Sequence, residues 1–158
     1  MSKSNSDNIK LEYTSRGEYK SSTLLSSKIN SKKLNFNEIL IPNSVSFNDK
    51  LGVHKIHSTS LNISIPENKI LEILIKNANT IIYGDFEKLT ISQNSGQIFL
   101  VNWNSPGLLK TISADIVFKN PKVKILSNLE SGSNCNNPKS DIVFEIIAVS
   151  SLINCVIF

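Results

Sequence analysis

The chain has 158 residues and contains little Ala and little Arg. It contains three Ala and one Arg. Scarcity of Ala removes the usual material of long helices. A single Arg argues against the bidentate contacts by which proteins recognise phosphates and bases. We therefore expect little helix and no nucleic-acid partner.

Long hydrophobic runs are also lacking. No stretch approaches the ~20 apolar residues of a membrane span. The first apolar run, Leu24-Leu25, is too short for the core of a secretory signal. We expect a soluble chain with no membrane span, and the sequence leaves its compartment open.

Cysteine is limited to Cys135 and Cys155. Two cysteines are too few for a disulfide framework or for a structural zinc site. They could form one disulfide closing a loop of about 20 residues, worth roughly 3 kcal/mol in the chain-entropy model. They could equally be free thiols, one in a loop and one in a terminal strand, and free thiols are the interpretation that we favour.

What the chain has in quantity is alternation of apolar and polar residues. Leu61, Ile63 and Ile65 alternate with polar residues before Pro66, and the same pattern resumes within residues 67–76. Such alternation indicates β-strands, because a helix needs apolar residues three and four positions apart. The sequence predicts an all-β protein.

Polar turns followed by apolar strands recur along the chain. Aligning the turns pairs Asn79, Gly96 and Ala114, at intervals of 17 and 18 residues. The phrase Asp-Ile-Val-Phe also occurs twice, at residues 115–118 and 141–144. A short strand cannot bury its apolar face alone, so repeated units are expected to stack. We predict a short β-solenoid or roll of stacked two-strand units of about 17 residues, with the two phrases as two rungs of one ladder.

Small and amide residues mark the corners of this repeat. Gly84 and Gly96 suit tight corners, where a positive φ is cheap only for Gly. Ala114 replaces a turn residue and is expected to avoid positive φ. Asn also tolerates the left-handed conformation. The Asn residues expected in such turns are Asn77, Asn79, Asn94 and Asn102.

The net charge of +4 is concentrated at the N-terminus. Residues 1–33 carry seven basic and three acidic side chains, whereas the remaining residues carry ten of each sign. We expect residues 1–20 to form a flexible basic segment, in which alternation at residues 9–13 allows a short strand. Residues 21–158 are expected to form one β-repeat domain, in which the less regular residues 21–60 are a β cap.

Few residues suggest chemistry. His54 and His57 are three apart on an expected strand, so they face opposite sides and make poor joint metal ligands. Asp115, Asp141 and Glu145 could bind Ca²⁺ or cleave glycosides if they converged on one face of a solenoid. A turn Asp before a strand is, however, common. We expect no catalytic residue, no metal and no cofactor.

Contacts with a partner would depend on exposed loops and chain ends. Trp103, the only Trp, could anchor a partner if exposed, or could cover the end of the core. Lys32 and Lys33 form the longest basic run and are further candidate contacts, although a solvated flank is the simpler interpretation. Residues 153–158 are expected to form a paired strand, or an edge for self-association if they stay unpaired.

The order of these patterns resembles a known family. A strand ending in Pro, residues 61–66, is followed by turn-plus-strand units at residues 95–98 and 113–116, with an intervening strand at residues 88–91. In these features the segment from Leu61 to Phe118 resembles the bacterial adhesin β-repeat family, also described as auto-transporter adhesin head domains. The resemblance implies a β-repeat fold and an adhesive role, with no defined ligand or active site.

Three functions fit these expectations. The first is a non-catalytic structural or adhesion-like module whose partner is an unidentified protein or surface. The alternative is a jelly-roll capsid or coat subunit with a basic N-terminal arm. The third is a carbohydrate-active β-helix, which requires its acidic residues to gather on one face.

Overall fold

The computed structural model describes residues 2–3, 8–17, 23–30, 33–41, 57–66, 68–84, 86–129, 133–135 and 139–157. The chain divides into two compact units, one of Met1–Lys10 with Ile63–Phe158 and one of Leu11–Asn62. This division differs from the expected single domain of residues 21–158, because the strands before Asn62 pack among themselves.

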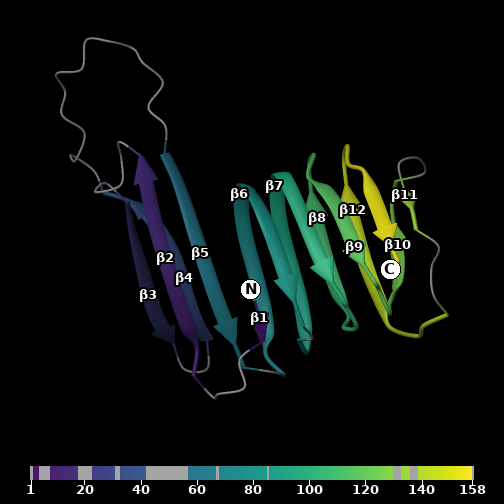
Figure 1. Cartoon of the computed structure of the whole chain (residues 1–158), viewed down its shortest axis with the longest axis horizontal. Helices are drawn as coiled ribbons and strands as arrows, with labels where there is room; N and C mark the ends of the chain where they lie inside the picture. Colours follow the sequence, from purple (N-terminus) through teal and green to yellow (C-terminus); the bar gives the residue numbers. More distant parts are fainter. Residues whose placement is uncertain are drawn as a thin grey trace, which may run out of the picture. The chain divides into compact units, whose positions relative to one another are not determined.

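The larger unit confirms the predicted fold class: it is a β-solenoid of about four turns of stacked parallel strands. Figure 1 shows these strands side by side. Each turn of the solenoid is called a rung below. The strands are β6 (Ile70–Tyr83), β7 (Lys88–Val101), β8 (Gly107–Thr111), β9 (Asp115–Lys119), β10 (Lys124–Ser127), β11 (Ser133–Asn134), β12 (Val143–Ala148) and β13 (Ile153–Val156).

The strand register fixes the length of the repeat. Ile70 on β6 pairs with Lys88 on β7, which lies 18 positions further along the chain. The same spacing relates β7 to β8 and to β9. Gly96 pairs with Ala78 rather than with Asn79. The predicted interval of 17 residues was therefore one residue short at the first rung.

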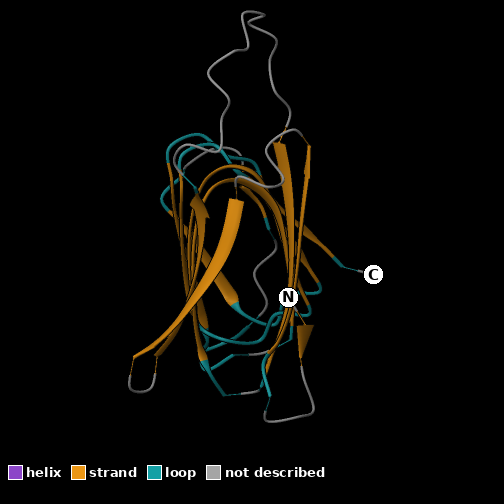
Figure 2. Ribbon diagram, turned by 90° about the vertical axis from the view of Figure 1, so that its left-hand side faces the viewer, coloured by secondary structure: helices purple, strands orange, loops and turns teal. Residues whose placement is uncertain are grey.

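Each complete rung crosses two layers. β6 and β7 are 14 residues long and contribute to both layers, whereas later rungs use a separate strand for each. The first half of β7 pairs with β8 in what we call the first layer, and its second half pairs with β9 in the second layer. The expectation of short strands separated by turns was therefore wrong for β6 and β7. Figure 2 shows the two layers joined by curved segments.

The last rung is inserted out of sequence order. β12 lies between β8 and β10 in the first layer, and β13 lies between β9 and β11 in the second. Figure 1 shows these yellow strands between green ones. The expected pairing of the C-terminal strand is thus confirmed for β13, which is paired on both sides and so leaves no association edge there.

The core lies between the layers and is filled by the inward residues of the alternating pattern. Phe118 on β9 and Phe144 on β12 are fully buried, and their rings meet edge to face with centroids 5.3 Å apart. These are the two Phe residues of the repeated Asp-Ile-Val-Phe phrase. The two phrases therefore lie in opposite layers and meet across the core, whereas we expected them to stack as rungs of one ladder.

Left-handed residues recur at one corner of the solenoid. Gly84, Asn102 and Asn120 have φ angles of 89°, 53° and 49° and follow the second-layer strands of three successive rungs. The predicted positive φ of Gly96 is also confirmed, at 98°. The other Asn residues expected in turns lie within strands, because β6 and β7 continue without a break from the first layer into the second. These residues are Asn77, Asn79 and Asn94.

The strands of residues 11–62 form the second unit. β3 (Thr23–Asn30) and β4 (Lys33–Leu40) form an antiparallel hairpin, and β2 (Lys10–Gly17) neighbours β5 (His57–Ile65). The Tyr13 hydroxyl donates a hydrogen bond to the Glu38 carboxylate at 2.7 Å. β2 occupies the place where alternation allowed a short strand, so this part of the expected flexible segment is a strand.

The C-terminal end of β5 and the first residues of the chain belong to the solenoid unit. β5 ends at Ile65, before Pro66, as the sequence predicted. β1 (Ser2–Lys3) pairs in parallel with this end of β5. Among the described residues, no helix has the length and apolar character needed to cross a membrane.

Candidate interaction surface

The outer side of the second layer is apolar where solvent-facing strands usually carry polar residues. Ile81, Phe99 and Val117 occupy paired positions on three neighbouring strands. Tyr83 and Val101 form the next paired row, which continues to Lys119. We call the five apolar side chains Ile81, Tyr83, Phe99, Val101 and Val117 the outer apolar face.

The outer apolar face is open to solvent. Ile81 is 43% exposed and Tyr83 is 48% exposed, and the other three side chains are partly exposed. Residues between them in the sequence, such as Ile82 and Leu100, are fully buried and hold the strands against the core. The face is thus an exposed apolar platform on a well-packed support, and contiguous exposed apolar patches often mark binding sites.

Charged groups border this platform on two sides. The Lys119 ammonium lies 5.8 Å from the centroid of the Phe99 ring, an arrangement that permits a cation–π interaction. The side chain thereby places a positive charge beside the apolar rows and covers part of the aromatic ring. On the other side of Val117, Asp115 occupies the outward position at the start of β9. A partner that docks here would meet aliphatic and aromatic groups between a basic and an acidic margin.

The outer side of the first layer differs in character. Its paired rows mix charged, polar and apolar side chains, so no row is apolar throughout. One row contains Glu72, Thr90, Leu108, Glu145 and Leu126. The next contains Leu74, Ser92, Lys110 and Ile147. The second layer therefore offers the more continuous apolar surface.

A buried glutamine helps to set the angle between the layers. Gln93 is fully buried where β7 bends, and its Nε2 donates hydrogen bonds to the carbonyl oxygens of Ala78 at 2.8 Å and Ser95 at 2.9 Å. Its Oε1 accepts one from the Thr80 hydroxyl at 2.6 Å. These bonds satisfy groups that the bend would otherwise leave buried and unpaired. They also fix the direction in which the second halves of β6 and β7 leave the corner.

Gln93 was not singled out from the sequence, although a signal existed. It occupies an inward position after Leu89 and Ile91, where the alternation calls for an apolar residue. A polar residue at such a position must find buried partners, because an unpaired buried amide is costly. The break in the apolar series therefore marks the corner of the solenoid.

Trp103 is not an exposed contact residue. It is fully buried, and its Nε1 donates a hydrogen bond to the carbonyl oxygen of Ser105 at 2.6 Å. Its ring packs near Phe86 and Phe144, with centroids 6.0 and 6.1 Å away. The prediction of an interaction role for Trp103 is wrong for this reason, and its alternative, a place in the core, is confirmed.

The predicted basic contact lies in the other unit. Lys33 is exposed at the start of β4, and Lys32 lies outside the described residues. His54 also lies outside the described residues, and His57 begins β5. Trp103 and Lys33 belong to different units.

The three acidic candidates do not form one cluster. Asp115 begins β9 in the second layer, where its carboxylate accepts a hydrogen bond from the backbone N–H of Leu152 at 3.4 Å. Glu145 lies on β12 in the first layer and Asp141 lies two residues before that strand, and both are exposed. In the part of the chain that the structure describes, no group of three His, Cys, Asp or Glu residues could hold a metal ion.

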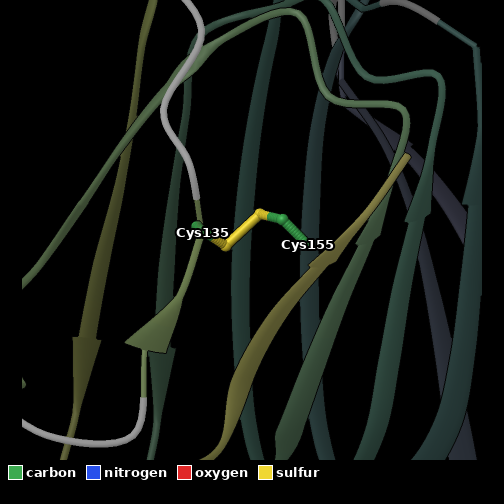
Figure 3. The surroundings of a disulfide bond; sticks show 2 residues. All are labelled: Cys135 and Cys155. Carbon is green, nitrogen blue, oxygen red and sulfur yellow. A yellow bond between two sulfur atoms is a disulfide. The ribbon is translucent and has the colours of Figure 1, made fainter.

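Cys135 and Cys155 are joined by a disulfide, so our preference for free thiols was wrong. The pairing of Ser133 with Ile153 and the parallel direction of β11 and β13 bring Cys135 opposite Cys155. Their Cα atoms lie 4.8 Å apart. Figure 3 shows the bond between the end of β11 and β13. The spacing of the two cysteines in the sequence did not reveal this register. The strand that lies between them in the chain, β12, is inserted between β8 and β10.

Comparisons with known proteins give no relative for this chain. No protein-family model matches it, and no curated protein or solved structure matches it either.

Proposed function

We propose that the chain is a non-catalytic β-solenoid module that binds a protein or another surface through its outer apolar face. The observation that carries this proposal is the pair of adjoining apolar rows on the solvent side of β6, β7 and β9. Exposed contiguous apolar patches on soluble domains commonly mark interaction sites. The resemblance of Leu61–Phe118 to adhesin β-repeat domains supports the same class of function.

The platform has the physical features that favour binding. Its strands are held by the core on one side and by the Gln93 corner on the other, so little order is lost when a partner docks. Tyr83 presents a large ring and a hydroxyl, a combination enriched among residues that dominate binding energy. Burial of the apolar rows would contribute about 25 cal/mol for each Å² removed from water.

The two other functions have less structural support. A jelly-roll subunit is an antiparallel sandwich, whereas the solenoid strands pair in parallel. A carbohydrate-active β-helix needs a pair of carboxylates flanking the scissile bond. Asp115 and Glu145 instead lie in different layers of the solenoid.

A pair of variants on one strand tests the proposal. Ile81→Lys places a charge in the outer apolar face, and Leu74→Lys places the same charge on the first-layer part of β6, where Leu74 is 74% exposed. Peptides selected from a random phage-displayed library on the wild-type protein serve as probes. We expect Ile81→Lys to weaken peptide binding about tenfold or more, which corresponds to about 1.4 kcal/mol, and Leu74→Lys to leave it within about twofold.

The opposite pattern would overturn the proposal. If the selected peptides bind Ile81→Lys as tightly as wild type but lose affinity for Leu74→Lys, the binding surface lies on the first layer. If a library of this kind yields no binding peptide, the outer apolar face does not act as a protein-binding platform. Circular dichroism of both variants checks that the β structure is unchanged.

A further inference from the structure

The interior position of β13 depends on its outer neighbour, β11. Among the described residues, β13 pairs with β9 at four positions and with β11 at two, Ser133 with Ile153 and Asn134 with Asn154. In the other layer, β12 pairs with β10 at four positions. Each strand of the inserted rung is therefore covered from outside by one neighbouring strand.

A side chain extends the cover of β12. The Asn128 amide follows β10 and bonds to both backbone groups of Ala148, accepting from its N–H at 2.8 Å and donating to its carbonyl oxygen at 3.0 Å. On β13 the equivalent position beyond the two β11 pairs is taken by the disulfide between Cys135 and Cys155. One layer is thus closed by hydrogen bonds and the other by a covalent bond.

The backbone groups that β11 covers can be identified from the register. Ile116 donates its N–H to the carbonyl oxygen of Leu152, and Asn120 donates to that of Val156. In a parallel pair, alternate residues of a strand face alternate neighbours. The backbone groups of Ile153 and Cys155 therefore face β11, and departure of β11 would leave them unpaired.

The surroundings of this edge are apolar. Leu152, before β13, is 56% exposed, and Ile157, after it, is 73% exposed. An unpaired strand edge flanked by exposed apolar side chains is a template for pairing with another chain. The opposite edge of β13 is already hydrogen-bonded to β9, so β13 would be presented in an ordered, extended form.

We propose that the Cys135–Cys155 disulfide is a redox lock on this edge. When the bond is intact, β11 stays on β13 and the solenoid end is closed. When the bond is reduced, β11 leaves, and β13 pairs edge to edge with β13 of a second copy of the chain. The self-association expected of an unpaired C-terminal strand thus becomes a property of the reduced protein.

The chemical step is an ordinary thiol–disulfide exchange with a dithiol. One thiolate of the dithiol attacks a sulfur of the Cys135–Cys155 bond and releases the other cysteine as a thiolate. The second thiol of the reductant then displaces the remaining cysteine and forms its own disulfide. Two electrons and two protons pass to the protein, which ends with two thiols. Both cysteines are partly exposed, so a small dithiol can reach them.

Light scattering after size exclusion tests the lock on the full chain. The oxidised protein is expected to be a monomer, and the same sample treated with dithiothreitol is expected to form dimers in a concentration-dependent manner. Cys135→Ser should behave like the reduced protein without any reductant. Hydrogen exchange at the Cys155 amide should quicken by about tenfold or more in reduced samples diluted to monomer, because this group loses its β11 partner.

A charge on the edge strand separates this mechanism from unspecific association. Asn154 is exposed at the centre of β13, so Asn154→Lys would bring like charges together when two copies of the strand pair. Combined with Cys135→Ser it should restore the monomer, whereas Ser150→Lys, with the same charge outside the strand, should not. The proposal is refuted if oxidised and reduced chains share one oligomeric state, or if association survives Asn154→Lys.

Discussion

Replacing Gly96 by Ala should destabilise the solenoid more than replacing Gly84 by Asn at another corner. Gly96 has φ of 98°, a conformation that side chains rarely adopt. A Cβ built at this position would overlap the carbonyl oxygen of Ala78 and lie 2.9 Å from its carbonyl carbon. Ala78 is the partner of Gly96 in the adjoining rung, so the clash is with backbone that cannot turn aside like a side chain.

Two costs add at this position. A left-handed conformation costs an L-residue about 1–2 kcal/mol, and forced overpacking costs about 1–3 kcal/mol. The free energy of unfolding should therefore fall by about 2–5 kcal/mol. For a chain of this size, one kcal/mol corresponds to about 2–4 °C in the melting temperature. The expected decrease in Tm is about 4–20 °C.

Urea and thermal unfolding, followed by circular dichroism of the oxidised protein, measure both quantities. Gly84→Asn is the matched control, because the equivalent corners of the next two rungs carry Asn102 and Asn120 at positive φ. We expect this variant to stay within about 1 kcal/mol of wild type, since Asn tolerates the left-handed region. The reasoning fails if Gly96→Ala melts within about 2 °C of wild type, or if Gly84→Asn loses as much stability.

Two further predictions concern the interior. Gln93→Leu should lower the free energy of unfolding by about 2–4 kcal/mol in urea denaturation, because it leaves two backbone carbonyls and the Thr80 hydroxyl buried without their partner; an unchanged midpoint would contradict this. The fluorescence of Trp103, the only Trp, should have its maximum at short wavelength and resist quenching by iodide until the chain unfolds, because the ring is fully buried. The emission spectrum of a solvated indole in the native protein would show that the ring is not buried.

Local patterns in the sequence predicted the strands and several of the corners. Alternation reports which side of a strand is buried, and Pro66 and Gly96 act through their own backbone geometry, so both signals are readable without a structure. The predicted repeat length was one residue short at the first rung because Asn79, which was aligned as a turn residue, lies inside the continuous strand β6. A continuous strand through a corner has no turn residues to count.

The inserted rung could not be predicted by the same means. A spacing of 18 residues from Gly107 leads to Ile125 on β10, yet Gly107 pairs with Phe144 on β12. A Cβ at Gly107 would overlap the Phe144 ring, lying 2.7 Å from its Cδ2. The missing side chain thus makes room for the ring. This fit between a glycine and a distant Phe is a property of tertiary packing.

The outer apolar face is visible in the sequence as three short apolar runs. Residues 81–83, 99–101 and 116–118 are apolar at every position, so both sides of these strands are apolar. A strand with only one buried side should alternate instead. Such runs at the repeat spacing indicate either a second buried contact or an exposed apolar surface. The structure shows the latter for the described residues of the second layer.

The proposed binding face and the proposed redox edge meet at the inserted rung, yet they can be separated. The row of Ile81, Phe99 and Val117 ends at Asn154 on β13, so the apolar series stops where the covered edge begins. Ile81→Lys should therefore leave reduction-dependent dimerisation unchanged, and Asn154→Lys should leave peptide binding unchanged. If Ile81→Lys abolished the reduced dimer, the two copies would be meeting through the outer apolar face, and the disulfide would act on that face rather than on the edge of β13.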